Sequence, residues 1–212
     1  MENSWKKAAK FLKNRGVVII PSDSCYGIAA LASNQEAVGR VYRIKAREFG
    51  KPSLLIVGST DQARELVEFT PLAEKLARKH WPGVLTIILK TENLKLPRQI
   101  YGIDYTPGVS SKVEQGLHTG SEPELTLAVR FPDKKELQDL ALEVGPFILP
   151  SANLAGLKPP FKPEDVDKKL KNQVDFFLDE PTNGNSPSTI VDARGEKSKI
   201  LRKGAVIVEE RS

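Results

Sequence analysis

The chain has 212 residues, of which 40% are hydrophobic and 28% are charged, and its formal net charge is +5. These values are ordinary for a globular protein, and no apolar run approaches the roughly 20 residues that a membrane-spanning helix needs. The single cysteine excludes an intramolecular disulfide, and the two distant histidines give no zinc-binding pattern. We therefore expect a cytoplasmic protein without a structural metal or a membrane partner. Its small basic excess suits nucleotide or RNA ligands without requiring them.

Apolar and β-branched runs predict strands, and capping residues followed by apolar residues at helical spacing predict helices between them. In chain order the predicted strands are 17–20, 53–57, 84–89, 125–131, 147–149, 176–178, 189–193 and 200–208. The predicted helix starts are Asn3 or Ser4, a capping box at 33–36, Ser59, Thr70 before Pro71, Asp133 with Glu136, and Pro163 for a helix to about Lys171. Residues 90–124 lack periodicity and are predicted to be an irregular insertion or a lid. This alternation predicts a single α/β domain over residues 1–212, built on one large mixed sheet.

Hydroxyls and cations lie close together in an early part of the chain. Ser22 and Ser24 lie in a turn after the first predicted strand, and the next predicted helix runs into Lys45, Arg47 and Lys51. Arginine offers a planar fork to phosphate oxygens and lysine a mobile charge, so this pairing could hold a polar substrate beside phosphates. Taken alone, the cations are also explained as solvated residues at a helix end, and the hydroxyls as turn formers. Neither the P-loop nor the dinucleotide fingerprint is present.

Further polar residues stand within or beside apolar strands. Arg130 lies in such a strand, where burying a guanidinium is costly without an anionic partner. Ser151 and Asn153 follow a strand end directly, which is where ligands tend to bind in α/β sheets. Ser188 precedes another predicted strand, and Arg202 lies on the last one. Each of these residues is a weak indication when it is considered alone.

Considered together, these segments resemble the YrdC/Sua5 family. The matching blocks, in chain order, are PSDSCYG, K-x-R followed by KP, WPGVLTIIL, LAVRFP, PSAN, PSTIVD and ILRKGA. They cover nearly the whole chain apart from the first helix and residues 90–124. The resemblance implies a single YrdC-like domain, with a twisted mixed sheet, flanking helices and a concave basic face.

The resemblance also implies an enzyme, an L-threonylcarbamoyladenylate synthase. Such a nucleotidyltransferase condenses L-threonine, bicarbonate and ATP and releases pyrophosphate, with Mg²⁺ expected on the triphosphate. Its product serves the N6-threonylcarbamoyladenosine modification of tRNA, so tRNA and the downstream threonylcarbamoyl-transfer proteins are implied partners. Because the carbamate of the substrate attacks the α-phosphate, the protein needs no nucleophile of its own. It has only to position groups and neutralise charge.

Individual residues take their roles from the same resemblance. Lys45 and Arg47 match the family's K-x-R motif and are the predicted catalytic residues, near the reacting carboxylates and phosphates. The residues matched to threonine contacts are Ser24, Arg130, Ser151 and Ser188. The residues matched to ATP contacts are Arg47, Lys51, Thr126, Asn153 and Arg202. No residue is matched to a metal ion.

The chain departs from the family pattern at several of these blocks. Ser22 and Ser24 replace threonines, Ala155 lacks a hydroxyl in SANLAG, and Phe161 in KPPF stands where a serine or threonine often contacts the nucleotide. Two other functions therefore stay open. One is an RNA-binding protein on this fold without synthase activity, whose tRNA binding would weaken steeply with salt and would not depend on threonine or ATP. The other is a protein that handles carbamoyl phosphate, as the hydrogenase-maturation relatives do, although accessory domains and zinc-finger cysteines are missing.

Overall fold

The computed structural model describes residues 3–46, 53–92, 95–104, 124–154, 156–184 and 186–209. Its strands are β1 Val18–Pro21, β2 Tyr26–Leu31, β3 Leu54–Ile56, β4 Leu85–Lys90, β5 Gly102–Asp104, β6 Glu124–Arg130, β7 Phe147–Ile148, β8 Phe176–Phe177, β9 Thr189–Asp192 and β10 Lys199–Arg202. Its helices and 3-10 turns are α1 Ser4–Lys13, α2 Gln35–Ile44, α3 Thr60–Arg64, α4 Pro71–His80, η1 Arg98–Ile100, α6 Lys135–Val144, η2 Pro163–Asp165 and α7 Lys168–Lys171.

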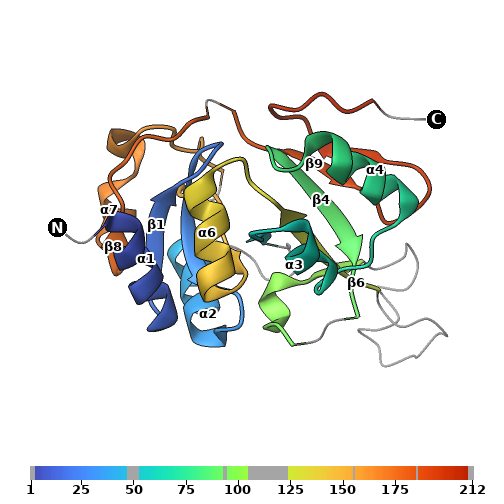
Figure 1. Cartoon of the computed structure of the whole chain (residues 1–212). Coiled ribbons are helices and arrows are strands. Elements are labelled where there is room, and N and C mark those ends of the chain that lie inside the picture. The colour runs from blue at the N-terminus through green and yellow to red at the C-terminus, as the bar shows by residue number, and fades with distance from the viewer. Residues whose placement is uncertain are drawn as a thin grey trace.

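All ten of these strands belong to one mixed sheet (Figure 1). The strand order is β10-β9-β4-β6-β3-β7-β2-β1-β8, and β5 pairs with the first residues of β6. The pairs β1–β8, β3–β6 and β4–β9 are parallel, whereas β1–β2, β2–β7, β4–β6 and β9–β10 are antiparallel. The predicted mixed α/β fold class is therefore confirmed.

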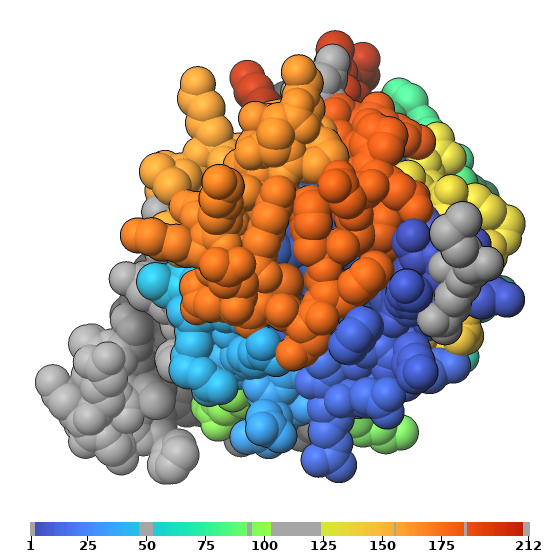
Figure 2. Space-filling view, turned by 90° about the vertical axis from the view of Figure 1, so that its left-hand side faces the viewer, coloured from blue at the N-terminus to red at the C-terminus, as the bar shows by residue number. Residues whose placement is uncertain are grey.

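Helices cover both faces of the sheet, and the alternation of side chains along β1 separates the two apolar clusters. Val18 and Ile20 point to the face that carries α1 and α6, which lie side by side in Figure 1. Ile19 points to the opposite face, where it joins residues of α2, α3 and α4. At one end of the sheet, Figure 2 shows the segment with η2, α7 and β8 (orange) beside the N-terminal elements (blue).

β2 is an interior strand of the sheet that the sequence analysis left unassigned. Its sequence YGIAAL contains a glycine and two alanines, which have low strand propensity, and it lacks a clear alternation of polar and apolar residues. Ile28, Ala29 and Ala30 are nevertheless completely buried. A strand with apolar side chains on both faces loses the alternation by which strands are predicted, and small residues allow the close packing seen here.

Two predicted elements in the C-terminal half are shorter than expected. The predicted helix over 163–171 is broken into η2 and α7 because Val166 is extended and packs into the core between them. The predicted strand over 200–208 ends at Arg202, after a register shift in its pairing with β9. Beyond it, the backbone N–H of Ala205 donates to the carbonyl of Pro187 instead of continuing the ladder.

Two predicted helix caps are also corrected. Helix α2 is capped by Asn34, whose side chain accepts from the N–H of Ala37, and not by Ser33. Helix α6 begins after Lys134, which occupies the N-cap position in place of Asp133 and makes no side-chain capping hydrogen bond. The predicted caps Asn3, Ser59 and Thr70 are confirmed.

The predicted insertion or lid at 90–124 includes ordered structure at its edges, namely η1 and β5. Residues 105–123 lie outside the described part of the chain, so a lid there stays a prediction. No helix in the described ranges combines the length and the apolar character of a membrane-spanning segment.

Candidate active site

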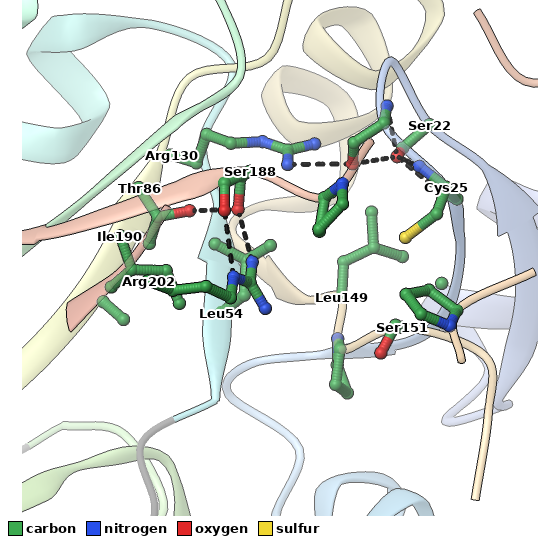
Figure 3. Close-up of a pocket in the computed structure, with 16 residues that line it drawn as sticks. Ser22, Cys25, Leu54, Thr86, Arg130, Leu149, Ser151, Ser188, Ile190 and Arg202 are labelled. Atoms are coloured by element: carbon green, nitrogen blue, oxygen red, sulfur yellow. Dashed lines mark hydrogen bonds between the residues drawn. The ribbon is translucent and has the colours of Figure 1, made fainter. Parts of the chain in front are cut away.

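A pocket of about 120 Å³ lies on the sheet where residues from β2, β3, β4, β6, β9 and β10 converge (Figure 3). Ala128 and Arg130 line it, whereas Val129 between them points to the cluster beneath α2. The pocket therefore opens on the same side of the sheet as α1 and α6. Five of the residues predicted to contact substrates line this one pocket, and they are Ser24, Arg130, Ser151, Ser188 and Arg202.

Arg130 is the most constrained charge in the pocket, since only 1% of it is exposed. Its Nη2 donates to Asp23 Oδ1 at 2.5 Å, and its Nη1 donates to Ser24 Oγ at 3.1 Å. The second carboxylate oxygen of Asp23 accepts from the backbone N–H of Asp133 at 2.9 Å. Arg130 is thus held in place by Asp23 and Ser24, while its buried Nε–H has no hydrogen-bond partner among the described residues.

The PSDS turn after β1 holds Ser24 against Arg130. Ser22 Oγ accepts from the backbone N–H groups of Ser24 and Cys25, each at 3.1 Å, and donates to the carbonyl of Cys25 at 2.6 Å. The oxygens of Ser22 and Ser24 are 3.0 Å apart. Ser22 therefore organises the turn, while Ser24 faces the guanidinium. Burial raises the pKa of the Cys25 thiol, which leaves it a neutral group in the lining of the pocket.

A second cation, Arg202, approaches the pocket from β10. Its Nε donates to the carbonyl of Ser188 at 3.0 Å, and its Nη2 donates to the hydroxyl of Ser188 at 2.9 Å. That hydroxyl is also 2.9 Å from Oγ1 of Thr86. Burial lowers the pKa of the Arg202 guanidinium, and the nearby charge of Arg130 lowers it further. Because Asp23 neutralises only one of the two guanidiniums, the pocket favours anionic ligands.

Lys45 lies beside the pocket and holds one of its walls. Its buried ammonium donates to the backbone carbonyls of Ser151 and Asn153, the latter at 2.6 Å. The side-chain amide of Asn153 donates to the carbonyls of Leu154 and Leu157, and its Oδ1 is buried with no partner among the described residues. Lys45 therefore fixes the turn that brings Ser151 into the pocket, and Asn153 offers an unused acceptor next to it.

The other predicted site residues are farther away or outside the described ranges. Thr126 lies on the same face of β6 as Ala128 and Arg130, and its hydroxyl donates to the carbonyl of Gly102 at 3.3 Å. Thr126 is not part of the pocket wall, but it lies in line with it along the strand. Arg47 and Lys51 lie outside the described residues, so their predicted roles stay predictions.

Two residues of the site were missed by the sequence analysis. Asp23 was placed in a turn, but no role was assigned to its carboxylate. Thr86 was treated only as part of an apolar strand. The signal that could have found Thr86 is the one that singled out Arg130, a polar residue within a strand that is otherwise apolar.

Comparison with known proteins agrees with the resemblance noted in the sequence. The family model Sua5/YciO/YrdC, described as telomere recombination, matches residues 10–204. A putative threonylcarbamoyl-AMP synthase from Methanocaldococcus jannaschii is 30% identical over 214 residues, which cover 99% of this chain and 91% of that protein. The threonylcarbamoyl-AMP synthase of Bacillus subtilis is 30% identical over 207 residues, which cover 96% of this chain and 54% of that protein.

The fold is also similar to that of a solved structure. P. abyssi Sua5, crystallised with L-threonine, matches with a TM-score of 0.78 and 28% identity over 96% of this chain and 55% of its own. The chain thus spans about half the length of the B. subtilis and P. abyssi proteins and most of the length of the M. jannaschii protein. With a family model that matches most of its residues, this chain belongs to the Sua5/YciO/YrdC family.

Proposed function

We propose that this protein is an L-threonylcarbamoyladenylate synthase, which joins L-threonine, bicarbonate and ATP and releases pyrophosphate. The observation that carries the proposal is the buried guanidinium of Arg130, with an unused Nε–H, in a small pocket lined by serine hydroxyls and Arg202. Such a pocket suits a small, anionic, hydroxyl-bearing ligand. The names of the M. jannaschii and B. subtilis relatives, and the L-threonine bound to P. abyssi Sua5, support the same substrate.

The chemistry needs positioned charges more than a reactive side chain. In the proposed reaction the amino group of threonine attacks the carbon of bicarbonate, a C–O bond breaks, water leaves and a carbamate forms. A carbamate oxygen then attacks the α-phosphorus of ATP. A new P–O bond forms, the bond to the β-phosphate breaks, and pyrophosphate leaves. Arg130 and Arg202 reduce the repulsion between the carboxylate, the carbamate and the phosphates. Lys45 contributes by holding the turn that contains Ser151. Arg47 is predicted to contribute a contact with the phosphates of ATP.

ATP is proposed to bind next to the pocket, near Thr126 on β6 and near Oδ1 of Asn153, which has no partner in the part of the chain that the structure describes. In this proposal Mg²⁺ enters the site bound to the triphosphate of ATP. No group of three or more His, Cys, Asp or Glu side chains in the described ranges is arranged to hold a metal ion.

The proposed product is a mixed anhydride of a carbamic acid and a phosphate, which is activated for transfer to an amine. An adenosine amino group of tRNA is the acceptor that the resemblance implies. We therefore propose proteins that transfer the threonylcarbamoyl group to tRNA in the cytoplasm as the downstream partners. Direct binding of tRNA by this chain is a separate proposal, and its test is whether binding depends on salt.

The decisive experiment is pyrophosphate release from ATP, with L-threonine and bicarbonate each present or omitted. Release that requires both substrates is the expected result. No release from folded protein would contradict the proposal, and salt-sensitive tRNA binding by that inactive protein would then support the RNA-binding alternative.

Lys45→Met tests the residue assignment. This variant keeps the aliphatic stem and removes the ammonium that holds the turn of Ser151. We expect adenylate formation to fall by about 100-fold or more, as when a preorganised charged donor is removed. The matched control is Lys135→Met, because Lys135 is exposed and pairs only with Asp139 among the described residues. Equal turnover in Lys45→Met and the native protein would show that Lys45 is not required.

A further inference from the structure

Two buried hydroxyls meet at the wall of the pocket. Thr86 lies on β4, and Ser188 immediately precedes the parallel neighbour β9. Their side-chain oxygens are 2.9 Å apart, and the two residues are 1% and 2% exposed. Figure 3 shows both hydroxyls beside the guanidinium of Arg202 and below that of Arg130.

Counting donors and acceptors leaves two possible directions for the hydrogen bond between them, and each direction leaves one hydroxyl proton for a ligand. A hydroxyl oxygen has one proton and two lone pairs. Arg202 Nη2 already donates to the oxygen of Ser188 and occupies one of its lone pairs. If Ser188 donates to Thr86, the remaining proton lies on Thr86 and needs an acceptor from a ligand, because no other partner of the Thr86 side chain occurs among the described residues.

The opposite direction places the remaining proton on Ser188, the hydroxyl that Arg202 contacts and therefore the one beside the charges that attract an anion. When Thr86 donates, Ser188 accepts from both Thr86 and Arg202, and both of its lone pairs are used. The proton of Ser188 is then directed away from these two donors and is available to an acceptor in the pocket. An anionic oxygen of the ligand is the natural acceptor, because the guanidiniums of Arg130 and Arg202 lie nearby.

We infer that Thr86 is a positioning residue that makes Ser188 a hydrogen-bond donor to an anionic oxygen of the amino-acid substrate. This inference rests on the proposed function, since it concerns the threonine that the pocket is proposed to bind. It also explains why a polar residue occupies position 86, between the completely buried apolar residues Leu85 and Ile87.

Two substitutions at this position separate positioning from packing. Thr86→Val keeps the branched shape and removes the hydroxyl, whereas Thr86→Ser keeps the hydroxyl and removes the methyl group. We expect Thr86→Val to raise KM for L-threonine about 10- to 100-fold, as when a hydrogen bond to a charged group is lost. KM for ATP should change little, and Thr86→Ser should retain most of the affinity for threonine. If Thr86 served only for packing, Thr86→Ser should raise KM for L-threonine more than Thr86→Val does.

The matched control is Thr91→Val, just after the end of β4. The hydroxyl of Thr91 is also buried and donates to the carbonyl of Leu66 at 2.6 Å, but Thr91 does not line the pocket. This control should lower thermal stability and leave KM for L-threonine unchanged.

The measurements are pyrophosphate release at varied L-threonine, calorimetric titration of L-threonine and thermal unfolding. A Thr86→Val protein with native KM and native affinity would overturn the inference while leaving the proposed function intact. If the native protein neither binds L-threonine nor uses it, the proposed function fails and this inference falls with it.

Discussion

Replacing Asp23 with asparagine tests the electrostatic contact on which the pocket depends. The side chains of Asp23 and Arg130 are 4% and 1% exposed, and the ion pair joins Oδ1 to Nη2 at 2.5 Å. The other carboxylate oxygen accepts from the backbone N–H of Asp133. Asparagine keeps the shape of the side chain but removes its charge. Its amide group also cannot accept from both partners, because one of its two terminal atoms is a donor.

The expected effect is large because the cation that remains is buried. Removing one partner of a buried ion pair costs about 3–5 kcal/mol, and a typical domain has only about 5–15 kcal/mol of total stability. For a chain of this length, each kcal/mol corresponds to a shift of roughly 2–4 °C in Tm. Asp23→Asn should therefore lower Tm by about 6–20 °C.

Urea and thermal unfolding, followed by circular dichroism, measure this loss. The matched control is Asp139→Asn, which breaks the ion pair between Asp139 and Lys135. The side chain of Asp139 is 57% exposed, and that of Lys135 is 75% exposed. Exposed pairs contribute little, so the control should unfold almost as the native protein does. An Asp23→Asn protein that unfolds at the same midpoint as this control would refute the reasoning, because the buried charge of Arg130 would then need no partner.

Two further substitutions test the surroundings of the PSDS turn. A Cβ at Gly184 would lie 2.3 Å from the carbonyl oxygen of Ser24. Gly184→Ala should therefore displace the PSDS turn and raise KM for L-threonine. An unchanged KM would contradict this prediction. Burial, assisted by the charge of Asp179, raises the pKa of Tyr26 from 10.0 to about 12. The neutral phenol therefore stabilises the fold below pH 10, and this contribution is lost as the pH rises towards 12. The stability advantage of the native protein over Tyr26→Phe should shrink over that interval in denaturation experiments, and a constant difference would argue against it.

Local signals predicted much of the fold. Runs of β-branched residues located β1 and β4, and the Thr70–Pro71 pair marked the start of α4. These signals succeed because a strand or a cap depends on residues that are close in the sequence. They failed for β2, which consists of small and apolar residues, and at 163–171, where Val166 is drawn into the core.

For the site, the sequence predicted several of the residues but not all of their partners. A guanidinium within an apolar strand indicated that Arg130 needs an anionic partner, and the structure provides one in Asp23. The resemblance to a family selected Ser24, Ser151 and Ser188, all of which line the pocket. The identity of the anionic partner was not predictable, because many carboxylates in the sequence were equally eligible.

The sequence by itself determined the fold class, most of the elements and the residue types that a polar, anion-binding site requires. Only the tertiary structure decided which of them meet. Asp23 and Arg130 are 107 residues apart in the sequence, and Thr86 and Ser188 are 102 residues apart. Their contacts depend on the order β9-β4-β6-β3-β7-β2, in which no two neighbours are consecutive strands of the chain. That order results from the burial of both faces of the sheet at once, which is a property of the whole chain and not of any single segment.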